Sequence, residues 1–113
     1  MNYLMFVCMD DTATPDPEDL ATMRERTQSW VDEMDGRGIR VQGQRLRPQQ
    51  DATTVSVRAG DVVVADGPFA ETKEQIAGFD ILHCADLDEA IEVASKHPVA
   101  RFGTLELRPF WEE

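Results

Sequence analysis

The side chains best suited to bind or transform a small molecule gather in one segment near the middle of the chain. Asp66, Glu71, Lys73 and Glu74 place both signs of charge within nine positions. Such a group could orient a polar ligand through hydrogen bonds and shift the pKa of a carboxylate. A solvated loop with local caps and ion pairs is the alternative. We expect Asp66, Lys73 and Glu74 to bind a ligand, and Asp66 is also a candidate for catalysis.

Two arginines are candidates for recognising a carboxylate on that ligand. Arg45 lies in one expected strand, and Arg108 shares the polar face of the last expected strand with Glu106. In a dimer packed sheet to sheet, these side chains would line an interior cleft, where a guanidinium suits a carboxylate. An ion pair between strands or between protomers is the alternative use of the same arginines.

The histidines and cysteines offer a second, weaker source of chemistry. His97 could titrate near neutrality and transfer a proton, so it is the other candidate for catalysis. A histidine near the C-terminal end of a helix also has a purely stabilising use. His83 and Cys84 are neighbours in an expected strand, so their side chains point to opposite faces and cannot share a metal ion. We therefore expect no bound metal and no other cofactor.

The composition narrows the possible partners and the compartment. The 113 residues carry a formal net charge of −11, which repels nucleic acid phosphates and anionic lipid headgroups. We expect no nucleic-acid partner and no association with a membrane, because the longest apolar run, residues 3–9, is too short to span a bilayer. No basic segment precedes this run, so a cytoplasmic protein with the reduced thiols Cys8 and Cys84 is expected.

Hydrophobic periodicity predicts two helices and six strands around these residues. A proline after Asp16 starts the first helix, and apolar residues from Leu20 to Met34 follow at helical spacing. The spacing of Thr72 and Gln75 predicts a cap and a short helical turn that Gly78 ends. Asp86 and Glu89 cap the second helix. The predicted strands span residues 2–9, 40–48, 54–58, 62–65, 79–85 and 104–110.

This order of elements predicts an α+β fold of the ferredoxin-like type. One domain, residues 1–113, would hold a four-stranded antiparallel sheet, an inserted β-hairpin and two helices on one sheet face. The other face would expose apolar side chains, so we expect a homodimer packed sheet to sheet. Gly67, between Asp66 and Pro68, is expected to adopt a positive φ.

The segment from Asp66 to Phe69, which reads DGPF, continues into AETKE and then Gly78-Phe79. Together with the apolar N-terminal strand, the DLDEA start of the second helix and the ELRP ending, it resembles the YCII-related family in its DGPF-type branch. The resemblance covers nearly the whole chain. It implies a dimeric α/β barrel of two ferredoxin-like protomers.

The family resemblance leaves the function open. Its wider pattern for acid/base chemistry is a histidine in the first helix and an aspartate before the proline that ends the second. This chain has no histidine in the first helix and carries His97 before Pro98, so the family mechanism does not transfer. We expect a cofactor-free enzyme that performs acid/base chemistry on a small polar organic molecule. The alternative is a non-catalytic ligand-binding or protein-interaction domain associated with sigma-factor regulation.

Overall fold

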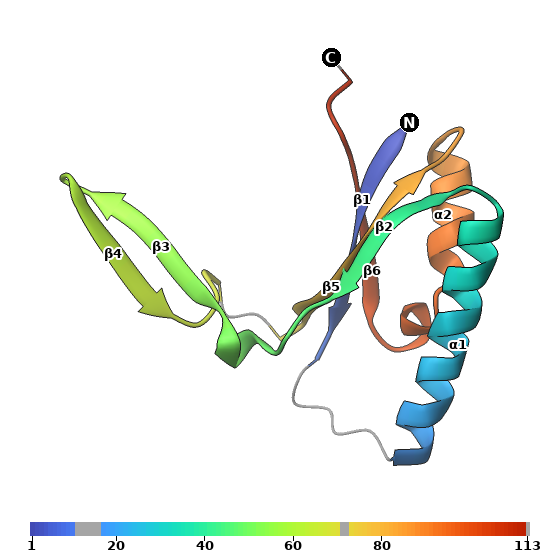
Figure 1. The fold of residues 1–113 in the computed structure, drawn as a ribbon, viewed down its shortest axis with the longest axis horizontal. Coiled ribbons are helices and arrows are strands. Elements are labelled where there is room, and N and C mark those ends of the chain that lie inside the picture. The colour runs from blue at the N-terminus through green and yellow to red at the C-terminus, as the bar shows by residue number, and fades with distance from the viewer. Residues whose placement is uncertain (11–16, 71–72, 113) are drawn as a thin grey trace.

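A computed structural model describes residues 1–10, 17–70 and 73–112 (Figure 1). The side chains of residues 17 and 18 are not among those described. The expected cap at Asp16, together with Glu71 and Thr72 from the central loop, also lies outside these ranges.

The order of elements follows the prediction from sequence. The helices are α1 (Pro17–Gly36) and α2 (Leu87–Ser95), with short 3-10 helices η1 (Gln49–Asp51) and η2 (Pro98–Arg101). The strands are β1 (Asn2–Met9), β2 (Arg40–Arg45), β3 (Thr53–Arg58), β4 (Asp61–Asp66), β5 (Gln75–His83) and β6 (Thr104–Pro109). Four of them form an antiparallel sheet in the order β2-β5-β1-β6, while β3 and β4 form a separate two-stranded sheet. The ferredoxin-like α+β fold with an inserted hairpin is therefore confirmed.

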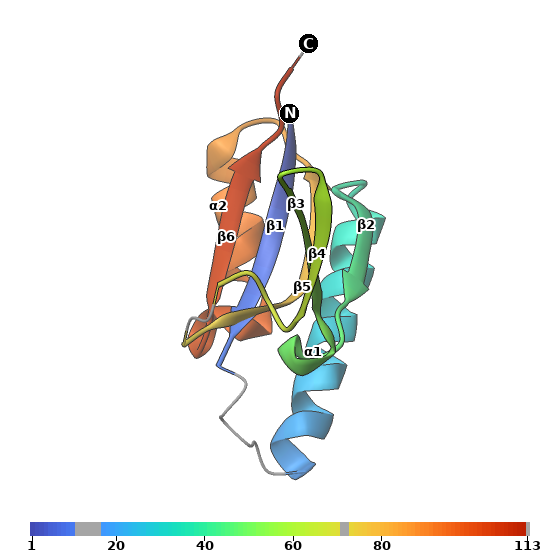
Figure 2. The same ribbon diagram turned by 90° about the vertical axis from the view of Figure 1, so that its left-hand side faces the viewer.

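Both helices cover the same face of the four-stranded sheet, and the core lies between these two layers (Figures 1 and 2). Alternate residues of β1 point toward the helices because successive side chains of a strand face opposite ways. Tyr3 and Met5 are 2% and 0% exposed, and Leu82 of β5 beside them is 0% exposed. From α1, Trp30 and Met34 pack into the same cluster.

The helices depart from the predicted apolar stripes at their outer edges. In α1, Leu20 is 37% exposed, and the N-terminal part of this helix extends past the sheet (Figure 1). In α2, helical spacing predicts an apolar stripe of Leu87, Ala90, Ile91 and Ala94. Ala90 and Ala94 are buried as predicted, together with Val93, whereas Leu87 and Ile91 are half exposed. The cap of α2 is confirmed, since the Asp86 side chain accepts a hydrogen bond from the Glu89 backbone N–H at 2.9 Å.

The segment after the central loop is a strand and not the short helical turn that its capping pattern predicted. β5 begins at Gln75, so Gly78 pairs with Val7 on one side and with Arg45 on the other. A Cβ on Gly78 would lie 3.0 Å from the Gln44 carbonyl oxygen, so the glycine permits close approach of β2. Pairing with two neighbouring strands outweighs a local capping preference, which contributes about 1 kcal/mol. β2 in turn ends at Arg45, three residues before its predicted end at Pro48.

The hairpin of β3 and β4 forms an arm, residues 53–66, that projects from the sheet (Figure 1). Its two-residue turn has positive φ at Ala59 (51°) and Gly60 (82°), as in the turns whose twist matches that of a hairpin. At the base of the arm, Gly67 has a φ of 96° and donates its N–H to the Ala52 carbonyl at 2.8 Å. The positive φ predicted for Gly67 is confirmed.

A partly buried ion pair joins β2 to β5 beneath the helices. Arg40 Nε donates to Asp80 Oδ1 at 2.8 Å, and Asp35 of α1 lies 3.5 Å from the same guanidinium. The Asp80 side chain is only 10% exposed, and its burial raises the pKa of its carboxyl, against the opposing effect of Arg40. A Cβ on Gly43, which pairs with Asp80, would overlap the Asp80 carboxylate and the Arg40 guanidinium. Glycine is therefore required at residue 43 by the space that the ion pair occupies.

The other face of the four-stranded sheet, here called the open face, has no helix over it (Figure 2). Its partly exposed side chains, as the strand register and the burial pattern place them, are Leu4, Phe6, Phe79, Ile81, Glu106 and Arg108. Among the helices of the described ranges, none combines the length and the hydrophobicity needed to cross a membrane.

The Gly43→Ala variant is expected to lower the free energy of unfolding by about 2 kcal/mol or more, because its methyl group displaces the buried Arg40–Asp80 pair. Urea denaturation followed by circular dichroism measures this change. Gly36→Ala is the matched control: a Cβ there meets no atom within 4 Å, and alanine favours the helix. Equal stability of Gly43→Ala and wild type would contradict the role assigned to Gly43.

Candidate functional site

A cleft lies between the N-terminal half of α1 and the segment around η2. Its volume is about 310 Å³, at the lower end of the range of small-molecule sites. Among the described residues, the lining side chains come from these two places. They are Asp19, Thr22, Met23 and Arg26 from α1, and Pro98, Arg101 and Phe102 from η2 and the residue after it.

The α1 side of the cleft follows from helical spacing. Asp19, Met23 and Arg26 lie four and then three residues apart, so their side chains share one face of the helix. The helix extends past the sheet at this end, and η2 packs beside it (Figure 1). One face of α1 is thereby left available to a ligand.

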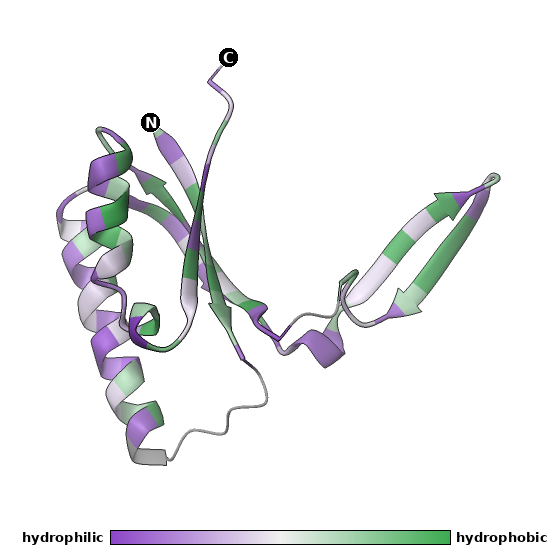
Figure 3. Cartoon of the chain, turned by 180° about the vertical axis from the view of Figure 1, so that it is seen from behind, coloured by the Kyte–Doolittle hydropathy of each residue, from purple (hydrophilic) through white to green (hydrophobic). Residues whose placement is uncertain are grey.

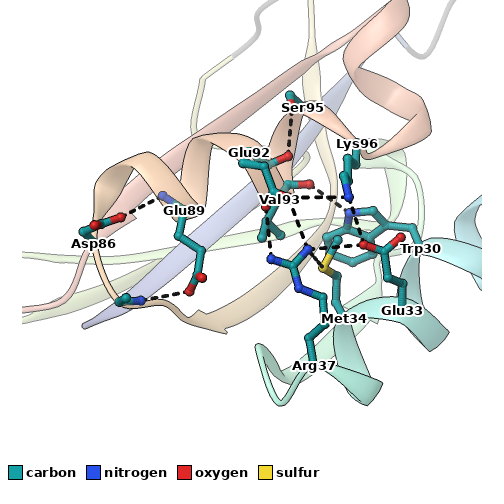
Figure 4. Close-up of polar contacts among 11 residues, drawn as sticks. Trp30, Glu33, Met34, Arg37, Asp86, Glu89, Glu92, Val93, Ser95 and Lys96 are labelled. Carbon is teal, nitrogen blue, oxygen red and sulfur yellow. Dashed lines mark hydrogen bonds and ion pairs between the residues drawn. The ribbon is translucent and has the colours of Figure 1, made fainter.

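Trp30 fixes the position of α1 relative to α2 and η2. Its indole Nε1 donates to the Val93 carbonyl of α2 at 3.0 Å, and its ring meets the His97 ring edge to face at 4.8 Å between centroids. Both side chains are buried, at 4% and 5% exposure. Figure 4 shows the indole directed toward Val93. This buried hydrogen bond and this aromatic contact thus fix the position of α1, which forms one wall of the cleft.

An ion-pair network on the surface joins the same two helices (Figure 4). Arg37 lies 3.2 Å from both Glu33 and Glu92, and Lys96 lies 3.2 Å from Glu33 and 3.4 Å from Glu92. The side-chain hydrogen bonds in this network lower the pKa of both glutamates. Each exposed pair contributes little alone, but the four together favour one arrangement of the helices.

The charges in the cleft favour an anionic ligand. Within the part of the chain that the structure describes, neither Arg26 nor Arg101 forms an ion pair with a carboxylate. Met23 and Phe102 add apolar surface to the lining. Among the lining residues that the structure describes, Asp19 supplies the carboxylate. Two guanidinium groups beside an apolar patch suit a small organic anion such as a carboxylate.

His97 lies directly behind this wall of the cleft, next to Pro98. Its Nδ1 accepts the Val99 backbone N–H at 3.1 Å, so the side chain caps η2. Burial lowers the pKa of His97 to about 4, so the ring is neutral at pH 7. A neutral imidazole with one nitrogen already accepting a hydrogen bond is poorly placed to accept a proton from a ligand in the cleft.

The residues predicted from the central loop lie at the opposite side of the sheet from the cleft. Asp66 ends β4, Lys73 and Glu74 precede β5, and Arg45 ends β2. Among the described residues, no hydrogen bond or ion pair joins Asp66, Lys73 and Arg45 to one another. These residues make no direct polar contact with one another, and their role in binding a ligand stays a prediction.

Arg108 and Glu74 do approach a common region on the open face. Arg108 donates to Glu106 at 2.7 Å, and its guanidinium lies 5.8 Å from the centroid of the Phe6 ring. Burial raises the pKa of the nearby Cys8 thiol, and the charges of Glu106 and Glu74 raise it further. The ion pair of Arg108 with Glu106 lies within β6, so it differs from the pair between strands or between protomers that was the alternative use of this arginine.

His83, the other histidine, ends β5 on the exposed surface, where its Nδ1 lies 2.7 Å from the Asn2 side-chain oxygen. Cys84, the next residue, is buried, and both cysteines are free thiols. In the described residues, no group of three or more histidine, cysteine, aspartate or glutamate side chains gathers as a metal site does.

Comparison with known proteins gives two findings. The model of a family described as the YCII-related domain matches residues 1–113. An uncharacterized protein of Rhizobium meliloti (strain 1021) is 48% identical over 67 residues. The matched segment covers 58% of this chain and 54% of that relative, so the similarity spans about half of the relative's length.

The burial of His97 predicts a loss of stability in mild acid. The pKa is near 6.5 in the unfolded chain and about 4 in the fold, so the unfolded state alone binds the proton between these values. The free energy of unfolding should fall as the pH drops from 6.5 to 4, by up to about 3 kcal/mol. In His97→Asn, whose side-chain oxygen can still accept the Val99 N–H, urea titrations at several pH values should show a flatter profile. Identical slopes in both proteins would contradict a neutral, buried His97.

Proposed function

Because the chain belongs to the YCII-related domain family, we propose that it binds a small polar organic anion, without a cofactor, in the cleft between α1 and η2. The observation that carries this proposal is that Arg26 and Arg101 both line this cleft, together with the apolar side chains of Met23 and Phe102. Neither arginine has a carboxylate partner among the described residues. The guanidinium groups bind the anionic end, and the apolar side chains contact the carbon skeleton.

Acid/base chemistry on the bound molecule is the second part of the proposal. Asp19 is the carboxylate within the cleft, and it lies on the same helix face as Arg26. A carboxylate that lines the same cleft as two guanidinium groups can accept a proton from a ligand that they hold. An enzyme of this kind needs Asp19, whereas a ligand-binding domain in sigma-factor regulation needs the arginines alone.

We propose a second possible binding place for the ligand, formed by the residues predicted from the central loop. Lys73, Glu74 and Arg108 would meet at the open face if a second copy enclosed it, with Arg45 and Asp66 at the adjoining strand ends. The Arg108–Glu106 ion pair weighs against this place, because a ligand carboxylate would have to displace Glu106.

We also propose that the chain forms a homodimer through the open face. Leu4, Phe6, Phe79 and Ile81 form an apolar band there that is only partly covered by its own chain. A second copy would remove this band from water at about 25 cal/mol per Å² of apolar area.

A screen of small carboxylic acids by thermal shift tests the ligand and its place together. For any acid that stabilises the wild type, Arg101→Ala is expected to weaken binding tenfold or more, because it removes a charge-assisted hydrogen bond. Arg108→Ala is the matched control and should leave the affinity unchanged. The proposed place would be contradicted if Arg108→Ala and Lys73→Ala weakened binding while Arg101→Ala left it unchanged. The ligand would then bind at the loop and the open face.

Asp19→Asn separates an enzyme from a binding domain. The variant keeps the arginines and the shape of the cleft, so we expect the acid found in the screen to bind it at least as tightly as the wild type. Chemical change of that acid, followed by proton NMR over hours, should occur with the wild type and stop in Asp19→Asn. Equal turnover by both proteins would exclude Asp19 as the proton acceptor.

A further inference from the structure

The arm formed by β3 and β4 stands apart from the rest of its own chain. Its strands pair only with each other and not with the four-stranded sheet. The Cα radius of gyration of the chain is 16.1 Å, whereas a compact chain of this length has about 13 Å. The arm accounts for this excess, because it projects well beyond the two packed layers (Figures 1 and 3).

One face of the arm carries four valines, with the pair of Thr53 and Asp66 beyond them at the base. Val55 is opposite Val64 and Val57 is opposite Val62, so the four side chains lie on the same face. We call these four residues the valine face. They are 62%, 61%, 58% and 68% exposed in that order. The reverse face is mixed: Thr54 is opposite Ala65, Ser56 is opposite Val63 and Arg58 is opposite Asp61.

A bare arm of this kind is not stable in water by itself. An isolated two-stranded hairpin is marginal at best, and four exposed valines in two adjacent cross-strand pairs form a sheet surface suited to burial. Hydrogen bonds from Thr54 to Gly67 (2.7 Å) and from Gly67 to Ala52 (2.8 Å) fix only its base. We therefore expect the valine face to contact another molecule.

Position and charge favour a second copy of this chain as that molecule. The arm leaves the sheet on the side opposite the helices, which is also the side of the open face (Figures 1 and 2). One molecule can therefore contact both surfaces. The four valines are uncharged, and Asp66 lies on their side of the arm only at its base. The chain as a whole has a net charge of −11, so two copies approach with less repulsion through the valines than through the charged remainder of the surface.

Symmetry and size support the same partner. In a two-fold dimer every contact is made twice, so both arms and both open faces would be covered at once. A standard interface uses about 20–30 residues from each partner. The arm strands provide six residues each, and alternate residues of the four-stranded sheet add to them.

We propose that the valine face of each arm packs against a second copy, so that two arms clasp the homodimer that the open faces form. This inference rests on the proposed homodimer and adds to it the surface that holds the two copies together. The arm, which contributes nothing to the core of its own protomer, would then be an element of the dimer.

Neighbouring valines on opposite faces of the arm provide the test. Val62→Lys places a charge in the valine face, and Val63→Lys places the same charge on the reverse face. Sedimentation equilibrium of the full chain is expected to give a dimer for the wild type and for Val63→Lys. The dimer dissociation constant of Val62→Lys should rise tenfold or more. Thermal melting by circular dichroism confirms that each variant is folded, since neither residue belongs to the core.

A third variant distinguishes failure of the arm from failure of the dimer. Ile81→Lys places a charge on the open face, outside the arm. If Ile81→Lys weakens the dimer while Val62→Lys dimerises as tightly as the wild type, the homodimer stands and the clasp is overturned. If the wild type is itself a monomer at micromolar concentration, the homodimer and the clasp are both overturned.

Discussion

The buried side chain of Trp30 is where both helices and the wall of the cleft meet. Its indole donates to Val93 in α2 and its ring contacts His97, which in turn caps η2. A tryptophan can hold three segments because it combines a large apolar surface with one hydrogen-bond donor. The orientation of α1 determines where Arg26 lies, and the cap on η2 determines where Arg101 lies. The cleft, and the anion binding proposed for it, therefore depend on contacts made some distance inside the protein.

Much of the fold was predictable from the sequence because its signals are local. Period-two and period-3.6 patterns located both helices and all six strands, and Asp86 with Glu89 marked the start of α2. The errors occur where a tertiary contact competes with a local preference. The segment around Gly78 has the pattern of a helical cap, but two neighbouring strands pair with it instead. In α2, the spacing of Ala90 and Ala94 correctly indicated burial, whereas Leu87 and Ile91 are half exposed, because the sequence does not show how far an apolar stripe turns toward the sheet.

The candidate site was less predictable than the fold. Arg26 and Asp19 share a helix face, and their spacing could have indicated this. Nothing local shows that Arg101, some seventy-five positions further along, lies across from them, because that proximity is produced by the packing of η2 on α1. The burial of His97 has the same origin. Its neighbour Pro98 marked the end of a helix, but only the packed Trp30 ring shows that the imidazole is excluded from water. Charged residues close in sequence drew attention to the central loop, of which the structure places Asp66 at the end of β4 and Lys73 and Glu74 just before β5.

The absence of a side chain at Gly43 links two positions that are far apart in the sequence. The Asp80 carboxylate occupies the volume where a Cβ at residue 43 would lie, and Arg40 holds it there. A slip of β2 by one residue would bring a glutamine side chain into that volume. The ion pair therefore also disfavours any other register between β2 and β5. Substitutions at residues 43 and 80 should consequently be tolerated only in combination during evolution: a larger residue at 43 requires a smaller one at 80. Among homologous sequences, residues 43 and 80 should therefore covary, which is information about the pairing of β2 and β5 that a single sequence does not contain.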